Sequence, residues 1–340
     1  MLAAVLEEVR KLSSRQVPDP GPGPGQVLIK IRACGVCGTD LKLYRGDYSA
    51  RVPVILGHEF AGEVAAIGEG VEGIAVGDPV VVDPNESCGK CEWCRTARPT
   101  FCREIAGYGV FRDGGFAEMC VVGERSVYRI PTSLAFEEAA FCEPVSCVVH
   151  CISRACIEPG DSVLVIGAGP TGLIMTQMAR LAGANPLIVA GRSRWKLGLA
   201  ERLGATHAVE SGDDDQLERQ VRNITGGRGA DIIIEAVGTP ETVRLAIRLA
   251  SRGGRVVIFG FSPENALATF SPFEVLSREL TILGSWVNPY TFQRAVDLLA
   301  SGALDVKSLI SRRVPVGGVL DAIRCLEEKP EGFVKAVVVF

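Results

Sequence analysis

Two short segments near the N-terminus carry side chains of the kinds that bind metal ions. Cys37 lies in the segment CGVCGTD (34–40), and His58 and Glu59 lie in the segment GHE (57–59). A thiolate and an imidazole suit zinc, and Glu59 could be a third ligand or a nearby base. A catalytic zinc needs three protein ligands and one open position. For a lone Cys and His, a buried free cysteine and an ordinary core histidine are the commoner explanation, so the rest of the chain must decide.

A separate group of four cysteines lies within fifteen residues of the chain. Cys88, Cys91 and Cys94 each stand three positions apart, and Cys102 follows after a longer gap. Four thiolates at these spacings can surround one tetrahedral zinc with no open position, which is a structural site. An iron–sulfur cluster is a weaker alternative because the spacing lacks the ferredoxin patterns. We expect this zinc to hold a lobe, residues 86–104, that has little core of its own.

A further carboxylate offers an alternative ligand for the first zinc. Glu143 precedes Pro144 in an apolar neighbourhood, after a predicted helix over residues 134–142 with Ser133 as its cap. Burying a carboxylate is costly unless a metal or cation is near, so Glu143 is a second candidate for the catalytic zinc. The alternative is an ordinary glutamate at a helix start. The residues alone leave the choice between Glu59 and Glu143 open.

The second half of the chain carries a glycine-rich turn. The apolar strand 162–166 runs into GAGPTG (167–172), and a helix is predicted over 173–181. Between a strand and a helix, G-x-G-x-x-G is the dinucleotide-binding turn, with the pyrophosphate at the helix N-terminus. This predicts cofactor contacts from the turn and from later loops: Gly167, Gly169, Pro170, Thr171, Gly172, Val237, Gly260, Phe261 and Trp286.

The end of the next predicted strand indicates which dinucleotide binds. An NAD site has Asp or Glu there, for the ribose 2′-hydroxyl. In this chain the position is Gly191, and Arg192, Ser193 and Arg194 follow it. Two guanidinium groups and a hydroxyl suit a 2′-phosphate, which favours NADP(H) over NAD(H). The alternative is a solvated basic turn.

The elements around these motifs predict two domains and an α/β fold. Residues 1–147 and 287–340, with alternating strands such as 26–33 and a closing strand over 333–340, are expected to form a β-barrel-type catalytic domain. Residues 148–286 alternate strands with helices, which indicates a doubly wound parallel sheet of the Rossmann type. We expect residues 213–215, three consecutive Asp, to form a solvated turn.

Composition narrows the class of protein. The 340 residues carry a net charge of -4 with no basic block, so neither nucleic acid nor an anionic membrane is expected as a partner. The start shows no signal-peptide pattern, and no apolar run reaches the roughly 18 residues of a membrane span. Twelve cysteines in a secreted chain would suggest disulfides, but the chain length, the absent signal peptide and the C-x-x-C spacing of some of them favour metal binding in a reducing cytoplasm.

Together these motifs resemble the zinc-dependent medium-chain dehydrogenases, in their polyol (sorbitol dehydrogenase-like) branch. The resemblance covers essentially the whole chain and implies a GroES-like catalytic domain beside the Rossmann domain. It implies a catalytic zinc held by Cys37, His58 and a glutamate, with Glu59 and Glu143 sharing the remaining roles, one of them through water. Glu143-Pro144 is the polyol-like feature, since liver-type alcohol dehydrogenases carry a cysteine in that ligand role. The relatives are dimers or tetramers, so a homo-oligomer is implied.

The resemblance also implies a reaction. Hydride is expected to move between a polyol or secondary alcohol and C4 of the nicotinamide, zinc lowering the pKa of the substrate hydroxyl and Thr39 passing the proton outward. Relatives often place a histidine where this chain has Lys42, which leaves the relay beyond Thr39 open. Gly191 and its arginines look similar to NADP-using ketose reductases of the branch. Two alternatives remain: an NAD-linked secondary-alcohol or sugar-phosphate alcohol dehydrogenase, and a non-catalytic NADPH-binding member of the family.

Overall fold

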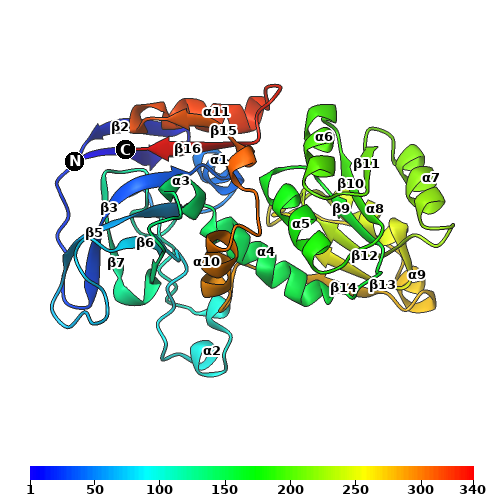
Figure 1. Cartoon of the computed structure of the whole chain (residues 1–340), viewed down its shortest axis with the longest axis horizontal. Coiled ribbons are helices and arrows are strands. Elements are labelled where there is room, and N and C mark those ends of the chain that lie inside the picture. The colour runs from blue at the N-terminus through cyan, green and yellow to red at the C-terminus, as the bar shows by residue number, and fades with distance from the viewer. The chain divides into compact units, whose positions relative to one another are not determined.

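The chain folds into two compact units. A computed structural model describes all residues, 1–340 (Figure 1). Unit 1 consists of Met1–Ser146 and Asn288–Phe340, and unit 2 of Cys147–Val287. No helix combines the length and the apolar character that crossing a bilayer requires.

Unit 1 is built on two β-sheets. The larger has seven strands in the order β15-β16-β3-β5-β6-β8, with β7 also paired to β3, and the smaller has the order β2-β1-β4. The strand bounds are β1 Leu2–Glu8, β2 Lys11–Gln16, β3 Gln26–Gly35, β4 Val54–Ile55, β5 Glu59–Ile67, β6 Pro79–Val82, β7 Met119–Gly123, β8 Val127–Arg129, β15 Ile310–Val314 and β16 Lys335–Val339.

Apolar side chains from both sheets form one core in unit 1. In β3 the residues Val27, Ile29 and Ile31 are buried, while Lys30 between them is exposed, as the period of two predicts. β16 pairs with β3 and with β15, so the strand predicted near the C-terminus is confirmed and completes this unit. Its helices and 3-10 turns are α1 Gly38–Arg45, α2 Glu92–Arg95, η1 Pro99–Phe101, η2 Glu124–Ser126, α3 Phe136–Ala139, α10 Phe292–Ala300, η3 Lys307–Leu309, η4 Val316–Gly318 and α11 Val319–Glu328.

Unit 2 is a parallel sheet of six strands alternating with helices. The order β11-β10-β9-β12-β13-β14 is that of the Rossmann fold, with every neighbouring pair parallel. The predicted α/β fold, a GroES-like domain plus a Rossmann domain, is confirmed. The bounds are β9 Val163–Ile166, α5 Pro170–Leu181, β10 Leu187–Gly191, α6 Arg194–Arg202, β11 His207–Glu210, α7 Asp214–Ile224, β12 Ala230–Glu235, α8 Pro240–Leu249, β13 Ala250–Ile258, α9 Pro272–Ser277 and β14 Thr281–Gly284.

Two local predictions were wrong. The helix predicted over 134–142 is only the short α3, and a second helix, α4 (Cys142–Ala155), begins at once and carries Glu143 and Pro144 in its first turn. Residues 213–215 are exposed, as predicted, but they begin a helix and do not form a turn. The Asp213 carboxylate accepts the backbone N–H groups of Asp215 and Gln216 and so caps α7, whose first turn contains the other two aspartates. The turn was wrong because an acidic run also fits a helix N-terminus.

Candidate active site

The start of helix α1 fixes the position of Cys37. Cys37 is the residue before the helix, and its backbone N–H donates to Asp40 Oδ2 at 2.8 Å. The helix ends at Gly46, whose φ of 81° suits glycine at a left-handed C-cap. A capped eight-residue helix therefore presents the thiol at its N-terminal end.

His58 and Glu59 are positioned by the entry to β5. Gly57 has a φ of +91°, and a Cβ there would lie 2.6 Å from Phe116 Cδ1, so only glycine fits this turn. Glu59 opens β5 and pairs with Gly35 at the end of β3. The ligand atoms of Cys37, His58 and Glu59 consequently lie within 4.8 Å of one another.

Asp40 orients His58 from behind. It is fully buried, and its Oδ1 lies 3.4 Å from His58 Nδ1, which leaves Nε2 as the nitrogen able to face a metal. Burial of His58 opposes its protonation, but the negative charges of Asp40 and Cys37 outweigh that effect and raise the pKa of the imidazole well above its usual value. The surplus of negative charge at this point favours a cation.

Glu59 also faces a buried lysine. Lys335 Nζ lies 2.6 Å from Glu59 Oε2 and 2.9 Å from Oε1, and both side chains are buried. Burial lowers the pKa of the Lys335 ammonium, but the charges of Glu59 and Cys37 outweigh it and raise the pKa above its usual value. Glu59 thus stands between one protein cation and the space beside Cys37 and His58.

The remaining predicted catalytic residues lie around this group. Glu143 is buried in the first turn of α4, and its charge also acts on Lys335, although it does not belong to the group of three. Thr39 Oγ1 lies 3.8 Å from Cys37 Sγ. Lys42 follows Thr39 by three residues on α1, so both lie on one face of the helix, and burial lowers the pKa of Lys42.

The donor set fits a zinc ion. One ligand atom from each of Cys37, His58 and Glu59 lies within 4.8 Å of the other two, and His58 and Glu59 are buried. A thiolate, an imidazole and a carboxylate from three directions are the ligand types of catalytic zinc sites, with a fourth position left for substrate. Cys37, His58 and Glu59 could therefore hold the ion, whereas Glu143 lies outside this group and acts on Lys335 through its charge.

The four remaining predicted ligands converge elsewhere in unit 1. The sulfur atoms of Cys88, Cys91, Cys94 and Cys102 lie within 4.8 Å of one another, and no disulfide joins them. Cys91 Sγ lies 3.5 Å from Cys94 Sγ, and Cys88 Sγ lies 3.9 Å from Cys94 Sγ. A tetrahedral zinc with Zn–S bonds of ~2.3 Å requires sulfurs ~3.8 Å apart, so the set matches a closed zinc site.

The cysteine lobe has little else to hold it together. Helix α2 and the 3-10 turn η1 contain no buried residue. The Trp93 and Phe101 rings touch edge to face at 5.5 Å. Backbone N–H groups point at the sulfurs: that of Cys94 is the main reason why the pKa of Cys91 is lowered to about 6, which favours the thiolate a metal needs.

In unit 2 the glycine-rich turn has the geometry that a dinucleotide requires. Gly167 has a φ of +115°, and Gly169 is the N-cap of α5, which begins at Pro170 with Thr171 next. A Cβ on Gly172 would lie 1.9 Å from Gly167 O, so only glycine lets the helix approach the strand this closely. The free N–H groups of this helix start are a ready site for pyrophosphate.

The other predicted cofactor residues lie at the same edge of the sheet, because the carboxyl ends of parallel strands share one edge. Arg192 and Ser193 follow β10, and Val237, Gly260 and Trp286 follow β12, β13 and β14. The Phe261 and Trp286 rings contact each other at 5.8 Å. The residues predicted to bind the cofactor therefore follow strands along the carboxyl edge of one sheet.

The environment of Gly191 explains the missing acidic residue. A Cβ at Gly191 would lie 3.0 Å from Ala168 Cβ and 3.3 Å from Leu197 Cδ2, so a larger side chain fits only if its neighbours shift. Arg192 beside it is exposed and makes no ion pair, whereas Arg194 pairs with Glu210 at 3.3 Å. Ser193 Oγ caps α6 by accepting the Lys196 N–H.

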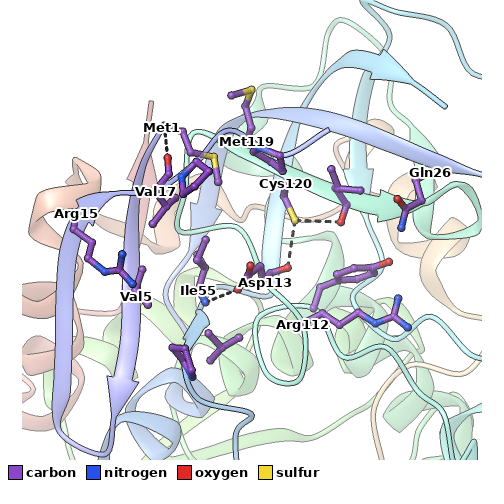
Figure 2. A pocket seen from close by; sticks show the side chains of 16 residues that line it. Met1, Val5, Arg15, Val17, Gln26, Ile55, Arg112, Asp113, Met119 and Cys120 are labelled. Carbon is purple, nitrogen blue, oxygen red and sulfur yellow. Dashed lines mark hydrogen bonds between the residues drawn. The ribbon is translucent and has the colours of Figure 1, made fainter. Parts of the chain in front are cut away.

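Unit 1 also contains a hollow of about 450 Å³, seen in Figure 2. Its labelled side chains come from residues 1–17, from β3 and β4 and from the segment 112–120, and the Asp113 carboxylate accepts the backbone N–H of Ile55. None of the candidate metal ligands lines it. The hollow is therefore separate from the site built around Cys37.

Comparison with known proteins follows the same division of the chain. Residues 23–132 match the alcohol dehydrogenase GroES-like domain, and residues 170–301 match the zinc-binding dehydrogenase family. Sorbitol dehydrogenase of Bacillus subtilis (strain 168) is 35% identical, over 97% of this chain and 95% of its own length. The chain belongs to the zinc-dependent medium-chain dehydrogenases, in their polyol branch. The predicted resemblance is confirmed, and the protein is an NAD(P)-dependent alcohol dehydrogenase.

Two solved structures of this dehydrogenase family contain different cofactors. A zinc-binding dehydrogenase from Sinorhizobium meliloti 1021, bound to NADP, is 40% identical with a TM-score of 0.94, covering 100% of this chain and 99% of its own. The RspB alcohol dehydrogenase of Escherichia coli CFT073, complexed with NADH, is 32% identical with a TM-score of 0.93 and the same coverage. Both nicotinamide dinucleotides therefore occur among close structural neighbours of this dehydrogenase.

Sequence reasoning overlooked two residues of this dehydrogenase site. Asp40 lies inside the CGTD motif, and its position three residues after the N-cap could have marked it as a capping carboxylate. Lys335 is the one charged residue of β16, whose other residues are apolar (KAVVV). A lysine in such a strand indicates a buried partner. Asp40 lies beside His58 and Lys335 pairs with Glu59, and each of these partners is far from it in the sequence.

Proposed function

We propose that the enzyme transfers hydride between NADP(H) and a polyol or secondary alcohol and its ketose or ketone. The observation that supports NADP(H) most directly is that Gly191, at the end of β10, is followed directly by Arg192. Position 191 carries no acidic side chain and is tightly packed beside Ala168 and Leu197, and the Arg192 guanidinium is exposed and unpaired one residue further on. A guanidinium there stabilises a 2′-phosphate, and no acidic side chain repels it.

The chain's own residues then have distinct tasks in the reaction. When bound, zinc supplies a Lewis acid for the substrate hydroxyl, and the nicotinamide accepts or returns the hydride. Cys37, His58 and one of Glu59 and Glu143 would hold the ion, and Asp40 orients the imidazole of His58. Thr39 holds the substrate proton on its hydroxyl and passes it outward along the α1 face that carries Lys42.

The second metal has a structural task. Cys88, Cys91, Cys94 and Cys102 form a set with no open position for substrate. Such a site stabilises the lobe that lacks a core, and contributes no group to the chemistry. We therefore propose two zinc ions per chain, one catalytic and one structural.

Cofactor preference is tested by substitution of Arg192. Arg192→Ala should raise the Kd for NADPH by about tenfold or more, since a charge-assisted pair is lost, and should leave the Kd for NADH nearly unchanged. Arg202→Ala, an exposed arginine at the far end of α6, is the matched control and should change neither.

Fluorescence titration with both cofactors gives the two Kd values, and a panel of polyols and secondary alcohols assayed with each cofactor gives the substrate class. Equal losses for NADPH and NADH in Arg192→Ala would contradict the 2′-phosphate assignment. Faster turnover with NADH across the whole panel would contradict the NADP(H) preference.

A further inference from the structure

Glu235 is a buried carboxylate that neither zinc site uses. It is the last residue of β12 and is fully buried. Its Oε1 accepts three hydrogen bonds of 2.8 Å, from the backbone N–H groups of Val237 and Gly238 and from Thr242 Oγ1. Three donors on one oxygen fix both the loop after β12 and the start of α8 to this side chain.

Glu235 also holds the next loop. Its backbone oxygen accepts the N–H groups of Phe259 at 3.0 Å and Gly260 at 2.9 Å, just after β13. Its second carboxylate oxygen, Oε2, is buried, has no hydrogen-bond partner and faces Gly260. A Cβ on Gly260 would lie 2.7 Å from that oxygen and 2.1 Å from Gly238 N. The two loops are therefore packed so closely that only glycine fits at position 260.

These loops carry residues that we place at the cofactor. Val237 lies on the first loop, and Gly260 and Phe261 on the second. The same contact network reaches the glycine-rich turn, since a Cβ on Gly167 would lie 2.9 Å from Val237 Cγ2. In the strand order, β12 and β13 lie on the opposite side of β9 from β10, which carries Arg192. The surface that Glu235 shapes thus serves the half of the dinucleotide remote from the 2′-phosphate.

We propose that Glu235 is a positioning residue for the cofactor, holding the loops after β12 and β13 as one preformed surface for the nicotinamide half. It acts through Val237 and Gly260 and does not touch the cofactor itself. A surface that is fixed before binding loses less conformational entropy when the dinucleotide docks. This inference rests on the proposed placement of the cofactor at the carboxyl edge of the unit 2 sheet.

The test is Glu235→Gln. Glutamine keeps an oxygen for the three donors but removes their charge assistance, and it places an amide group against Gly260. We expect the Kd values for NADPH and NADH to rise by the same factor, about tenfold, while kcat at saturating cofactor changes by less than about threefold.

The matched control is Asp231→Asn at the other end of β12. Asp231 also accepts three bonds, from Ser162 N, Ser162 Oγ and Ser251 Oγ, and its loss should lower the melting temperature without changing either Kd.

Two results would contradict the positioning role of Glu235. Unchanged Kd values in folded Glu235→Gln, or a lowered melting temperature alone as in the control, would overturn the positioning role. If that variant fails to fold, Thr242→Val removes one of the three donors and should weaken both cofactors about twofold to fivefold; unchanged Kd values would again overturn it. Failure of the proposed function is a separate result, because it appears in the wild-type protein as absent dinucleotide binding or in Arg192→Ala as equal loss of both cofactors.

Discussion

Lys335 is the residue on which the charge balance of the catalytic site depends. It is the buried cation that pairs with Glu59, and the charges of Cys37 and Glu143 also act on it. A buried ion pair contributes little net stability, but removing one partner leaves the other charge buried and uncompensated. The ammonium also lies 5.6 Å from the centre of the Phe141 ring, a favourable place for a cation.

Lys335→Met should therefore destabilise the zinc-free protein by about 3–5 kcal/mol, because Glu59 loses its partner. The loss should be smaller in the zinc-loaded protein, where the ion supplies positive charge next to the same carboxylate. Urea unfolding of both forms measures the two free energies. The double variant Glu59→Gln with Lys335→Met is the control and should recover part of the loss. A zinc-free Lys335→Met protein as stable as the wild type would contradict this account.

Among the elements, the cysteine lobe differs most from its surroundings. Most strands and helices elsewhere in unit 1 bury apolar side chains, but α2 and η1 bury none, and we expect metal coordination to replace the missing core of the lobe. Cys94→Ser should lower the zinc content from two ions per chain to one. It should also speed amide hydrogen exchange across residues 88–102 while leaving the sheet of unit 2 protected.

Zinc analysis and hydrogen-exchange mass spectrometry read these two effects separately. Cys156→Ser is the matched control, since Cys156 is exposed and lies outside both cysteine groups. Cys37→Ser should remove the other ion and abolish turnover without speeding exchange in the lobe. Retention of two zinc ions in Cys94→Ser would show that the four sulfurs do not form one site.

Helices and strands could be predicted from the sequence where the local residue pattern determines the structure. β3, the glycine-rich turn and α5 follow from apolar periodicity and from glycines at positions that admit no Cβ. The helix predicted over 134–142 failed because α3 and α4 meet within two residues, and a continuous apolar pattern does not reveal such a break. Lys335 escaped notice because it pairs with Glu59, 276 residues away, and sequence spacing carries no record of that contact. Asp40 and Glu235 bond to residues close in sequence, but burial gives each its role, and spacing does not reveal burial.

At the scale of the whole molecule, unit 2 has an unpaired strand edge and several exposed apolar side chains. β14 is the last strand of its sheet, so one side of its backbone has no partner strand. Close in sequence, the side chains of Leu267, Phe273 and Leu276 are 83%, 73% and 74% exposed. Apolar side chains this exposed, in a segment that leads into an edge strand, are typical of a surface that another protein covers.

We expect a second copy of the chain to cover this surface, because two identical β14 edges can satisfy each other's hydrogen bonds about a two-fold axis. Leu276→Lys should then shift the protein from dimer or tetramer toward a smaller species in size-exclusion chromatography with light scattering, since it would bury two lysines at the contact. Val76→Lys, at a 63% exposed position in unit 1, is the control and should leave the mass unchanged. A wild-type protein that is monomeric at micromolar concentration would rule out this assembly, while an oligomer that Leu276→Lys leaves intact would place the contact elsewhere on the chain.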